Sequence, residues 1–77
     1  MTTVTIKLDT IDKVRNFVNT ISHIDGDFDL VSGRYRVDAK SIMGIFSLDL
    51  SKPLELELGD KADAGDIKTA LKDFIIG

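Results

Sequence analysis

The sequence predicts an α+β fold, an open-faced β-sandwich in which an antiparallel four-stranded sheet carries helices on one face. Two observations lead to this prediction. Apolar residues alternate with polar ones in four short segments and recur at helical spacing in three others. These segments follow one another in the order β-α-β-β-α-β-α, without a repeat, a low-complexity tract or a linker. When strands pair in one sheet with one solvent-exposed face, the helices pack on the other face. Because the chain has no linker, we expect residues 1–77 to form a single domain.

The first strand and the first helix are expected at the N-terminus. From Thr2 to Leu8, aliphatic side chains alternate with polar ones, as in a half-buried strand. Asp9 and Thr10 both suit the N-cap of a helix that we expect from about residue 10 to residue 22. Its apolar residues share one face at steps of three and four: Ile11, Val14, Phe17, Val18 and Ile21.

Residues 27–38 are expected to form a hairpin. Apolar residues alternate with aspartates in its first half, and Ser32-Gly33 suits a tight turn. In its second half, Arg34 and Arg36 share the wet face of the strand. We interpret these arginines as solvated charges that can pair with Glu55 and Glu57 of the last strand, and not as an anion site.

Three further elements complete the chain. A short helix is expected from Ser41 to about Ser47, and Pro53 opens a strand in which leucines alternate with glutamates. Asp63 is the expected N-cap of a last helix that continues to the end of the chain. The apolar face of that helix consists of Ile67, Ala70, Leu71, Phe74 and Ile75.

Composition excludes several classes of function. The net charge of −3 argues against a general nucleic-acid binder, which needs an excess of Lys and Arg. The chain has no cysteine, so it offers neither a disulfide nor a thiolate metal site. No secretory signal and no apolar run of membrane-spanning length are present. We therefore expect a cytoplasmic protein without a membrane partner, a metal or a cofactor, and no catalytic set points to an enzyme.

The short helix carries more apolar residues than one turn can bury in one direction. Ile45 and Leu48 are the expected core members. Ile42, Met43 and Phe46 would then form a partly exposed patch, and a flexible methionine beside an aromatic ring suits a partner surface. The alternative is that the ring of Phe46 folds back into a small core.

The string Lys40-Ser41-Ile42-Met43-Gly44-Ile45-Phe46-Ser47-Leu48 resembles the regulatory-serine segment of HPr, the histidine-containing phosphocarrier of the bacterial sugar phosphotransferase system. The string falls between the hairpin and the last strand, where that family places it, and the order of elements agrees along nearly the whole chain. The resemblance implies that Ser41 is phosphorylated by an ATP-dependent HPr kinase. It also implies that the phosphorylated form acts with a catabolite control regulator. The alternative is that Ser41 only caps the helix.

The phosphocarrier histidine of that family is missing. HPr carries it in a Gly-x-His-x-Arg-Pro string just before the first helix. Residues 8–14 of this chain contain no histidine, glycine or proline, and Asp9 and Asp12 would repel a phosphoryl group. His23, the only histidine, is expected at the other end of the helix, where the dipole disfavours a phosphate.

The chain is therefore identified as resembling a divergent HPr-like protein, and the resemblance leads us to expect a non-catalytic regulatory or adaptor module in carbon catabolite regulation. Ser41 is the expected phosphorylation site. The partner-binding residues are expected to be Lys40, Ile42, Met43 and Phe46. HPr kinase and a catabolite control regulator are partners that the resemblance implies, and the oligomeric state is left open. Two alternatives are an atypical phosphocarrier and an interaction domain unrelated to sugar transport.

Overall fold

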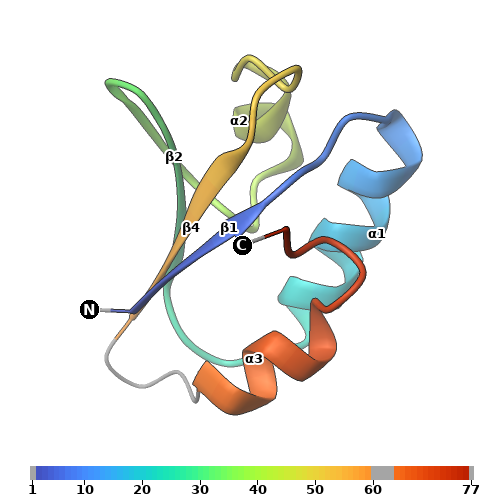
Figure 1. Cartoon of the computed structure of the whole chain (residues 1–77), viewed down its shortest axis with the longest axis vertical. Coiled ribbons are helices and arrows are strands. Elements are labelled where there is room, and N and C mark those ends of the chain that lie inside the picture. Colours follow the sequence, from blue (N-terminus) through green and yellow to red (C-terminus); the bar gives the residue numbers. More distant parts are fainter. Residues whose placement is uncertain (1, 60–63, 77) are drawn as a thin grey trace.

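The computed structural model describes residues 2–59 and 64–76 of the chain. The elements follow in the predicted order β-α-β-β-α-β-α (Figure 1). Their bounds are β1 (Thr2–Ile6), α1 (Ile11–Ser22), β2 (Phe28–Ser32), β3 (Tyr35–Asp38), α2 (Ile42–Phe46), β4 (Leu54–Leu58) and α3 (Ala64–Ala70). Asp63, the expected N-cap of the last helix, lies outside the described residues.

The four strands form one antiparallel sheet in the order β1-β4-β2-β3. Its apolar face is set by register, because Leu56 of β4 lies opposite both Val4 of β1 and Leu30 of β2. Helices α1 and α3 cover that face (Figure 1). The prediction of an open-faced α+β sandwich is therefore confirmed.

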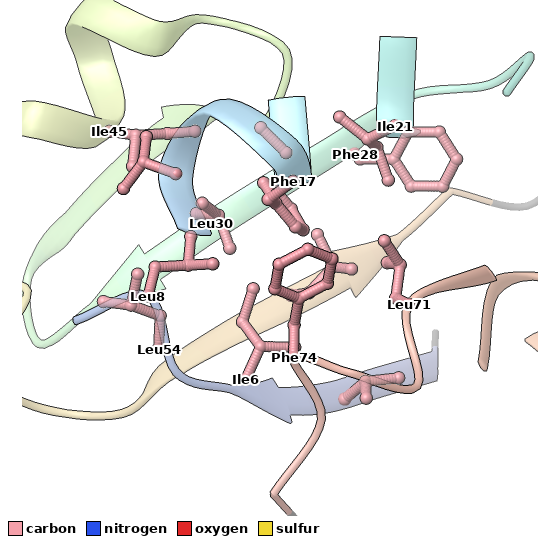
Figure 2. Packing of buried hydrophobic residues seen from close by; sticks show 14 of the residues in the cluster. Ile6, Leu8, Phe17, Ile21, Phe28, Leu30, Ile45, Leu54, Leu71 and Phe74 are labelled. Atoms are coloured by element: carbon pink, nitrogen blue, oxygen red, sulfur yellow. The ribbon is translucent and has the colours of Figure 1, made fainter. Parts of the chain in front are cut away.

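The core fills the space between the sheet and these helices (Figure 2). Phe17 of α1 and Phe74, which follows α3, meet edge to face, with ring centroids 5.8 Å apart and planes at 87°. Ile6 and Leu30 contribute to the core from the sheet, and both are fully buried. Among the described residues, no polar or charged residue is classed as buried. The core is thus held by apolar packing.

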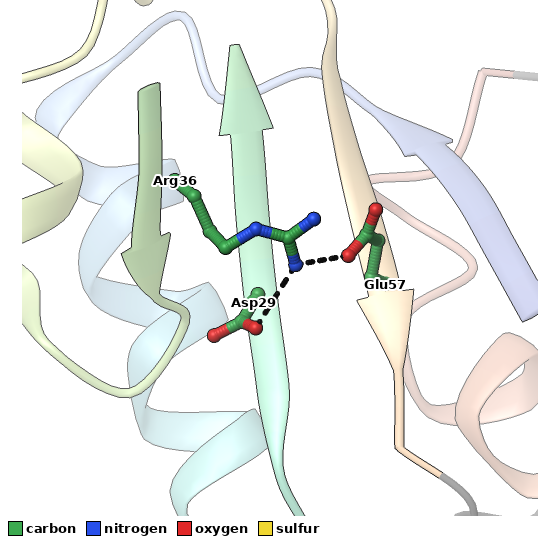
Figure 3. A network of polar contacts seen from close by, with 3 residues as sticks. All are labelled: Asp29, Arg36 and Glu57. Atoms are coloured by element: carbon green, nitrogen blue, oxygen red, sulfur yellow. Dashed lines mark hydrogen bonds and ion pairs between the residues drawn. The ribbon is translucent and has the colours of Figure 1, made fainter. Parts of the chain in front are cut away.

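The open face of the sheet carries charge. Asp29 of β2 and Glu57 of β4 lie opposite each other, and Arg36 of β3 reaches both (Figure 3). Its Nη1 lies 3.2 Å from Asp29 Oδ2 and also donates to Glu57 Oε1. These two carboxylates, Glu57 first, raise the pKa of Arg36 above its ordinary value. The predicted pairing of Arg36 with Glu57 is confirmed.

Arg34 differs from the prediction. The turn between β2 and β3 consists of Gly33 and Arg34, because Ser32 and Tyr35 are the last paired residues. Gly33 has φ +60, the left-handed value that a two-residue hairpin turn requires at its first position. Arg34 therefore lies in the turn, not on the strand, and it forms no ion pair within residues 2–59 and 64–76.

Two apolar positions also differ. Ile11 was expected on the buried face of α1, but its side chain is 62% exposed, whereas Val14 one turn later is fully buried. The helix begins at Ile11, so its first turn extends past the core. Ala70, expected on the apolar face of the last helix, is exposed at the end of α3.

The last helix ends earlier than predicted. α3 stops at Ala70, and the following residues return to the edge of the sheet beside β1. The N–H of Lys7 donates to the carbonyl of Phe74 at 2.9 Å, and the N–H of Ile76 donates to that of Thr5 at 3.0 Å. Unpaired N–H and C=O groups on an edge strand invite such pairing. From the carbonyl of Phe74 onward, pairing with the β1 edge therefore takes the place of the helical hydrogen bonds that the spacing of the apolar residues had predicted.

Candidate functional site

The predicted site begins with Ser41, the N-cap of α2. Its backbone is extended (φ −99, ψ 104), and its Oγ accepts a hydrogen bond from the N–H of Gly44 at 3.2 Å. The carbonyl of Ser41 accepts from the N–H of Ile45 at 3.0 Å, which closes the first turn. Ser41 is half-buried. This is the arrangement that makes serine a preferred N-cap residue.

Gly44 allows this turn to lie against the sheet. A Cβ at this position would stand 3.2 Å from the Cβ of Val37 and 3.3 Å from the Oγ of Ser41. Both distances are tighter than ordinary packing contacts. The glycine of the Lys-Ser-Ile-Met-Gly string therefore lets α2 approach β3 while the serine caps the helix.

The segment before Ser41 is held at several points. The N–H of the buried Ala39 donates to the carbonyl of Phe28 at 2.9 Å, and the N–H of Lys40 donates to Asp38 Oδ1 at 2.9 Å. The N–H of Ser41 donates to the carbonyl of Asp38 at 3.0 Å. These bonds fix the position of the serine relative to β2 and β3.

The side chain of Lys40 turns inward. Its Nζ donates to the carbonyl of Ile24 at 2.8 Å and lies 5.5 Å from the centroid of the Phe28 ring. The residue is half-buried. The structure thus gives Lys40 an internal role, joining the α2 N-cap region to the segment between α1 and β2.

The apolar residues of α2 divide into two sets. Ile45 is fully buried and Leu48 is 6% exposed, as expected for core members. Met43 is 79% exposed, Phe46 is 42% exposed, and Ile42 is partly buried against the core. Met43 and Phe46 are neighbours on the helix surface because they are three positions apart. We call Ile42, Met43 and Phe46 the α2 patch.

The N-terminus of α1 is satisfied by the chain itself. Thr10 is the N-cap, and its Oγ1 accepts from the N–H of Lys13 at 3.1 Å. Asp9 forms an ion pair with Lys13 at 2.9 Å. The hydrogen bond from the Lys13 side chain lowers the pKa of Asp9 below its ordinary value. Asp12 places a further carboxylate in the first turn of α1. No histidine is present here.

His23 lies at the opposite end of α1, where it is the exposed C-cap. Its Nδ1 lies 2.6 Å from the carbonyl oxygen of Asn19, and because a carbonyl only accepts, Nδ1 is the donor. At a rise of ~1.5 Å per residue, about 20 Å of helix separates His23 from the N-cap Thr10. The structure therefore does not bring His23 to the place where a phosphocarrier histidine stands.

Sequence reasoning missed the internal bonds of Lys40 and a hollow beside the β2–β3 turn. The Lys40 bonds join residues far apart in the chain, so no local pattern reveals them. Ser32-Gly33 predicted the turn that lines the hollow but not the hollow itself. Among the described residues, no group of three His, Cys, Asp or Glu side chains could hold a metal ion, and no described helix is long and apolar enough to span a bilayer.

Comparison with known proteins supports the fold. No protein-family model and no curated protein match the chain. The structure is similar to the crystal structure of HPr-C-His from Thermoanaerobacter tengcongensis, with a TM-score of 0.77 and 30% sequence identity. The match covers 95% of this chain and 89% of the other.

The fold and its match to HPr-C-His thus define a phosphocarrier-related protein of the open-faced sandwich class. The chain belongs to the HPr-like family, and it is a divergent member that lacks the phosphocarrier histidine. HPr-like proteins are carriers rather than enzymes.

Proposed function

We propose that this protein is a non-catalytic regulatory or adaptor module of the phosphotransferase type, phosphorylated on Ser41 and binding protein partners through residues 41–46. It acts in the cytoplasm, and its partners are an HPr kinase and a catabolite control regulator. One observation carries the proposal. A serine N-cap stands within one turn of the exposed Met43, in an HPr-like chain whose α1 N-terminus has no histidine.

The charge change explains how the serine would act on the α2 patch. A phosphoryl group on Ser41 adds about two negative charges and three acceptor oxygens. These stand next to Ile42, the first residue of the patch. A partner that contacts only apolar surface is weakened by that charge, whereas a partner that brings an arginine gains a charge-assisted hydrogen bond. The same surface therefore distinguishes two partners according to its phosphorylation state.

The first test is phosphorylation. The protein is incubated with an HPr kinase and ATP, and its intact mass is measured beside an authentic HPr treated in parallel. We expect one phosphoryl group on the wild type and on Ser47→Ala, and none on Ser41→Ala. Ser47 is the matched control because it is the serine at the other end of α2. An unmodified wild-type chain beside a modified HPr contradicts the proposal.

The second test concerns the patch. Phosphorylated protein is titrated against a purified catabolite control regulator, and Met43→Asp is expected to weaken binding about tenfold or more. Ile11→Asp is the matched control, because Ile11 is also a highly exposed aliphatic residue but lies on α1. Equal affinity of the Met43→Asp variant and the wild type excludes the α2 patch as the binding surface.

A further inference from the structure

A hollow of about 520 Å³ lies between the β2–β3 turn and the loop that joins α2 to β4. The two segments lie at the same end of the sheet (Figure 1), and residues of both line the hollow. The volume falls within the ~300–1,000 Å³ of small-molecule sites. Neither Ser41 nor the α2 patch lines the hollow, so the proposed function does not account for it.

Two cations line this hollow. Arg34 comes from the turn and Lys52 from the loop, and both are exposed. Neither side chain forms an ion pair within the described part of the chain, whereas Arg36 and Lys13 are both paired with carboxylates. The charge of Lys52 nevertheless reaches Asp49, because it adds to the hydrogen bonds from Ser51 that lower the pKa of that carboxyl. A guanidinium and an ammonium on one concave surface suit an anion with several acceptor oxygens, and phosphate is such an anion.

One carboxylate also lines the hollow, and it limits the choice of ligand. Oδ1 of Asp49 accepts from the N–H of Ser51 at 3.1 Å and from its Oγ at 2.6 Å. Oδ2 of Asp49 accepts no hydrogen bond from residues 2–59 or 64–76 and can accept one from a ligand. Because the carboxylate repels a bare phosphate, a ligand that fits this wall also needs a hydroxyl donor.

Two further residues of the lining offer flat apolar surface. Tyr35 is 71% exposed, and its phenol forms no hydrogen bond with the described residues. Pro53 lines the hollow as well and is exposed. The C–H face of a small ring can pack on these side chains while its hydroxyls reach polar groups.

We propose that this hollow binds a phosphorylated polyol, with the phosphate at Arg34 and Lys52 and a hydroxyl donating to Asp49. The site is separate from the α2 patch, so the inference does not rest on the proposed function. Ribose 5-phosphate is a suitable probe, because it carries a dianionic phosphate and hydroxyls on a small ring. Free ribose and inorganic phosphate represent its two halves.

The test is a titration of the 15N-labelled protein in which ligand binding is monitored through the amide chemical shifts. Ribose 5-phosphate is expected to shift the amides of Gly33, Tyr35 and Lys52 in a saturable way, and to bind more tightly than either half. Arg34→Gln and Lys52→Gln are each expected to weaken it about fivefold or more. Arg15→Gln and Lys72→Gln remove the same charges at exposed positions outside the hollow and are expected to leave binding unchanged.

A substitution of Asp49 distinguishes more sharply between ribose 5-phosphate and inorganic phosphate as the ligand. In Asp49→Asn the amide oxygen still accepts from the N–H of Ser51, so the loop keeps its bond. The lost charge should tighten inorganic phosphate and reduce the advantage of ribose 5-phosphate over it. The expected dissociation constant of ribose 5-phosphate is about 1 mM. If ribose 5-phosphate causes no saturable shifts up to ~20 mM, the proposal is overturned. Equal affinity for inorganic phosphate also overturns it, as does preferential binding of a phosphoserine peptide.

Discussion

The ammonium of Lys40 donates to the carbonyl of Ile24 at 2.8 Å and thereby ties the residue before Ser41 to the segment after α1. The same ammonium lies 5.5 Å from the centroid of the Phe28 ring. The contact joins residues 16 positions apart, so it fixes the α2 N-cap region by tertiary structure. The position of Ser41 therefore depends on the contacts of Lys40 as well.

Lys40→Met keeps the apolar stem and removes both polar contacts. We expect the free energy of unfolding to fall by about 1–2 kcal/mol, since a half-buried carbonyl loses a charged donor. Urea denaturation measures this change. Lys72→Met is the control because Lys72 is exposed and should change stability by no more than ~0.5 kcal/mol. Equal stability of the two variants would show that the Ile24 contact contributes nothing.

Ser41→Ala removes the hydrogen bond to the N–H of Gly44 and is expected to cost about 1 kcal/mol in urea denaturation. Ser41→Asp keeps an acceptor at the N-cap and should stay within ~0.5 kcal/mol of the wild type. Ser22→Ala, at the exposed end of α1, controls for loss of a serine hydroxyl. If the alanine and aspartate variants are equally stable, the cap does not stabilise α2.

Phe74→Ala and Phe46→Ala remove the same ring from different environments. Phe74 is 9% exposed and packs on Phe17, so its loss should cost about 3–5 kcal/mol. Phe46 is 42% exposed, and its loss should cost less than half as much. Thermal or urea unfolding compares the two. Similar losses would mean that Phe46 belongs to the core and not to the α2 patch.

The pKa of Asp9 is lowered mainly by the hydrogen bond from Lys13. Lys13→Met should therefore raise it toward its ordinary value of 3.8, which a carboxyl 13C titration measures directly. Asp49, whose pKa is lowered by Ser51, is the internal reference and should not move. A carboxyl whose pKa is lower in the folded protein than in the unfolded one stabilises the fold at pH values above its unfolded pKa. This contribution is lost as the pH falls through its folded pKa. The stability difference between wild type and Asp9→Asn should thus vanish in acid.

Local patterns predicted most of the fold because they reflect which side chains are buried. The alternation of leucines and glutamates in β4 and the spacing of Val14, Phe17 and Ile21 in α1 correspond directly to the observed core. Periodicity failed after Ala70 because apolar spacing does not distinguish a helix from a turn followed by a segment that pairs with an edge strand. Ile75, expected on a helix, forms a bridge with Ile6 instead.

The candidate site was predictable to a lesser degree. Ser41 and the exposed Met43 could be found from a capping residue followed by too many apolar side chains for one turn. The inward position of Lys40 and the concave surface beside Arg34 could not, because both depend on segments that only the folded chain brings together.

One measurement tests most directly whether this protein is regulatory and not a phosphoryl carrier. The wild type is offered two donors in parallel, enzyme I with phosphoenolpyruvate and an HPr kinase with ATP, and its intact mass is measured at neutral pH. The account predicts one phosphoryl group from the kinase alone, located on Ser41 by fragmentation and absent from Ser41→Ala. A phosphoryl group from enzyme I that is lost in His23→Ala, with none from the kinase, would contradict it.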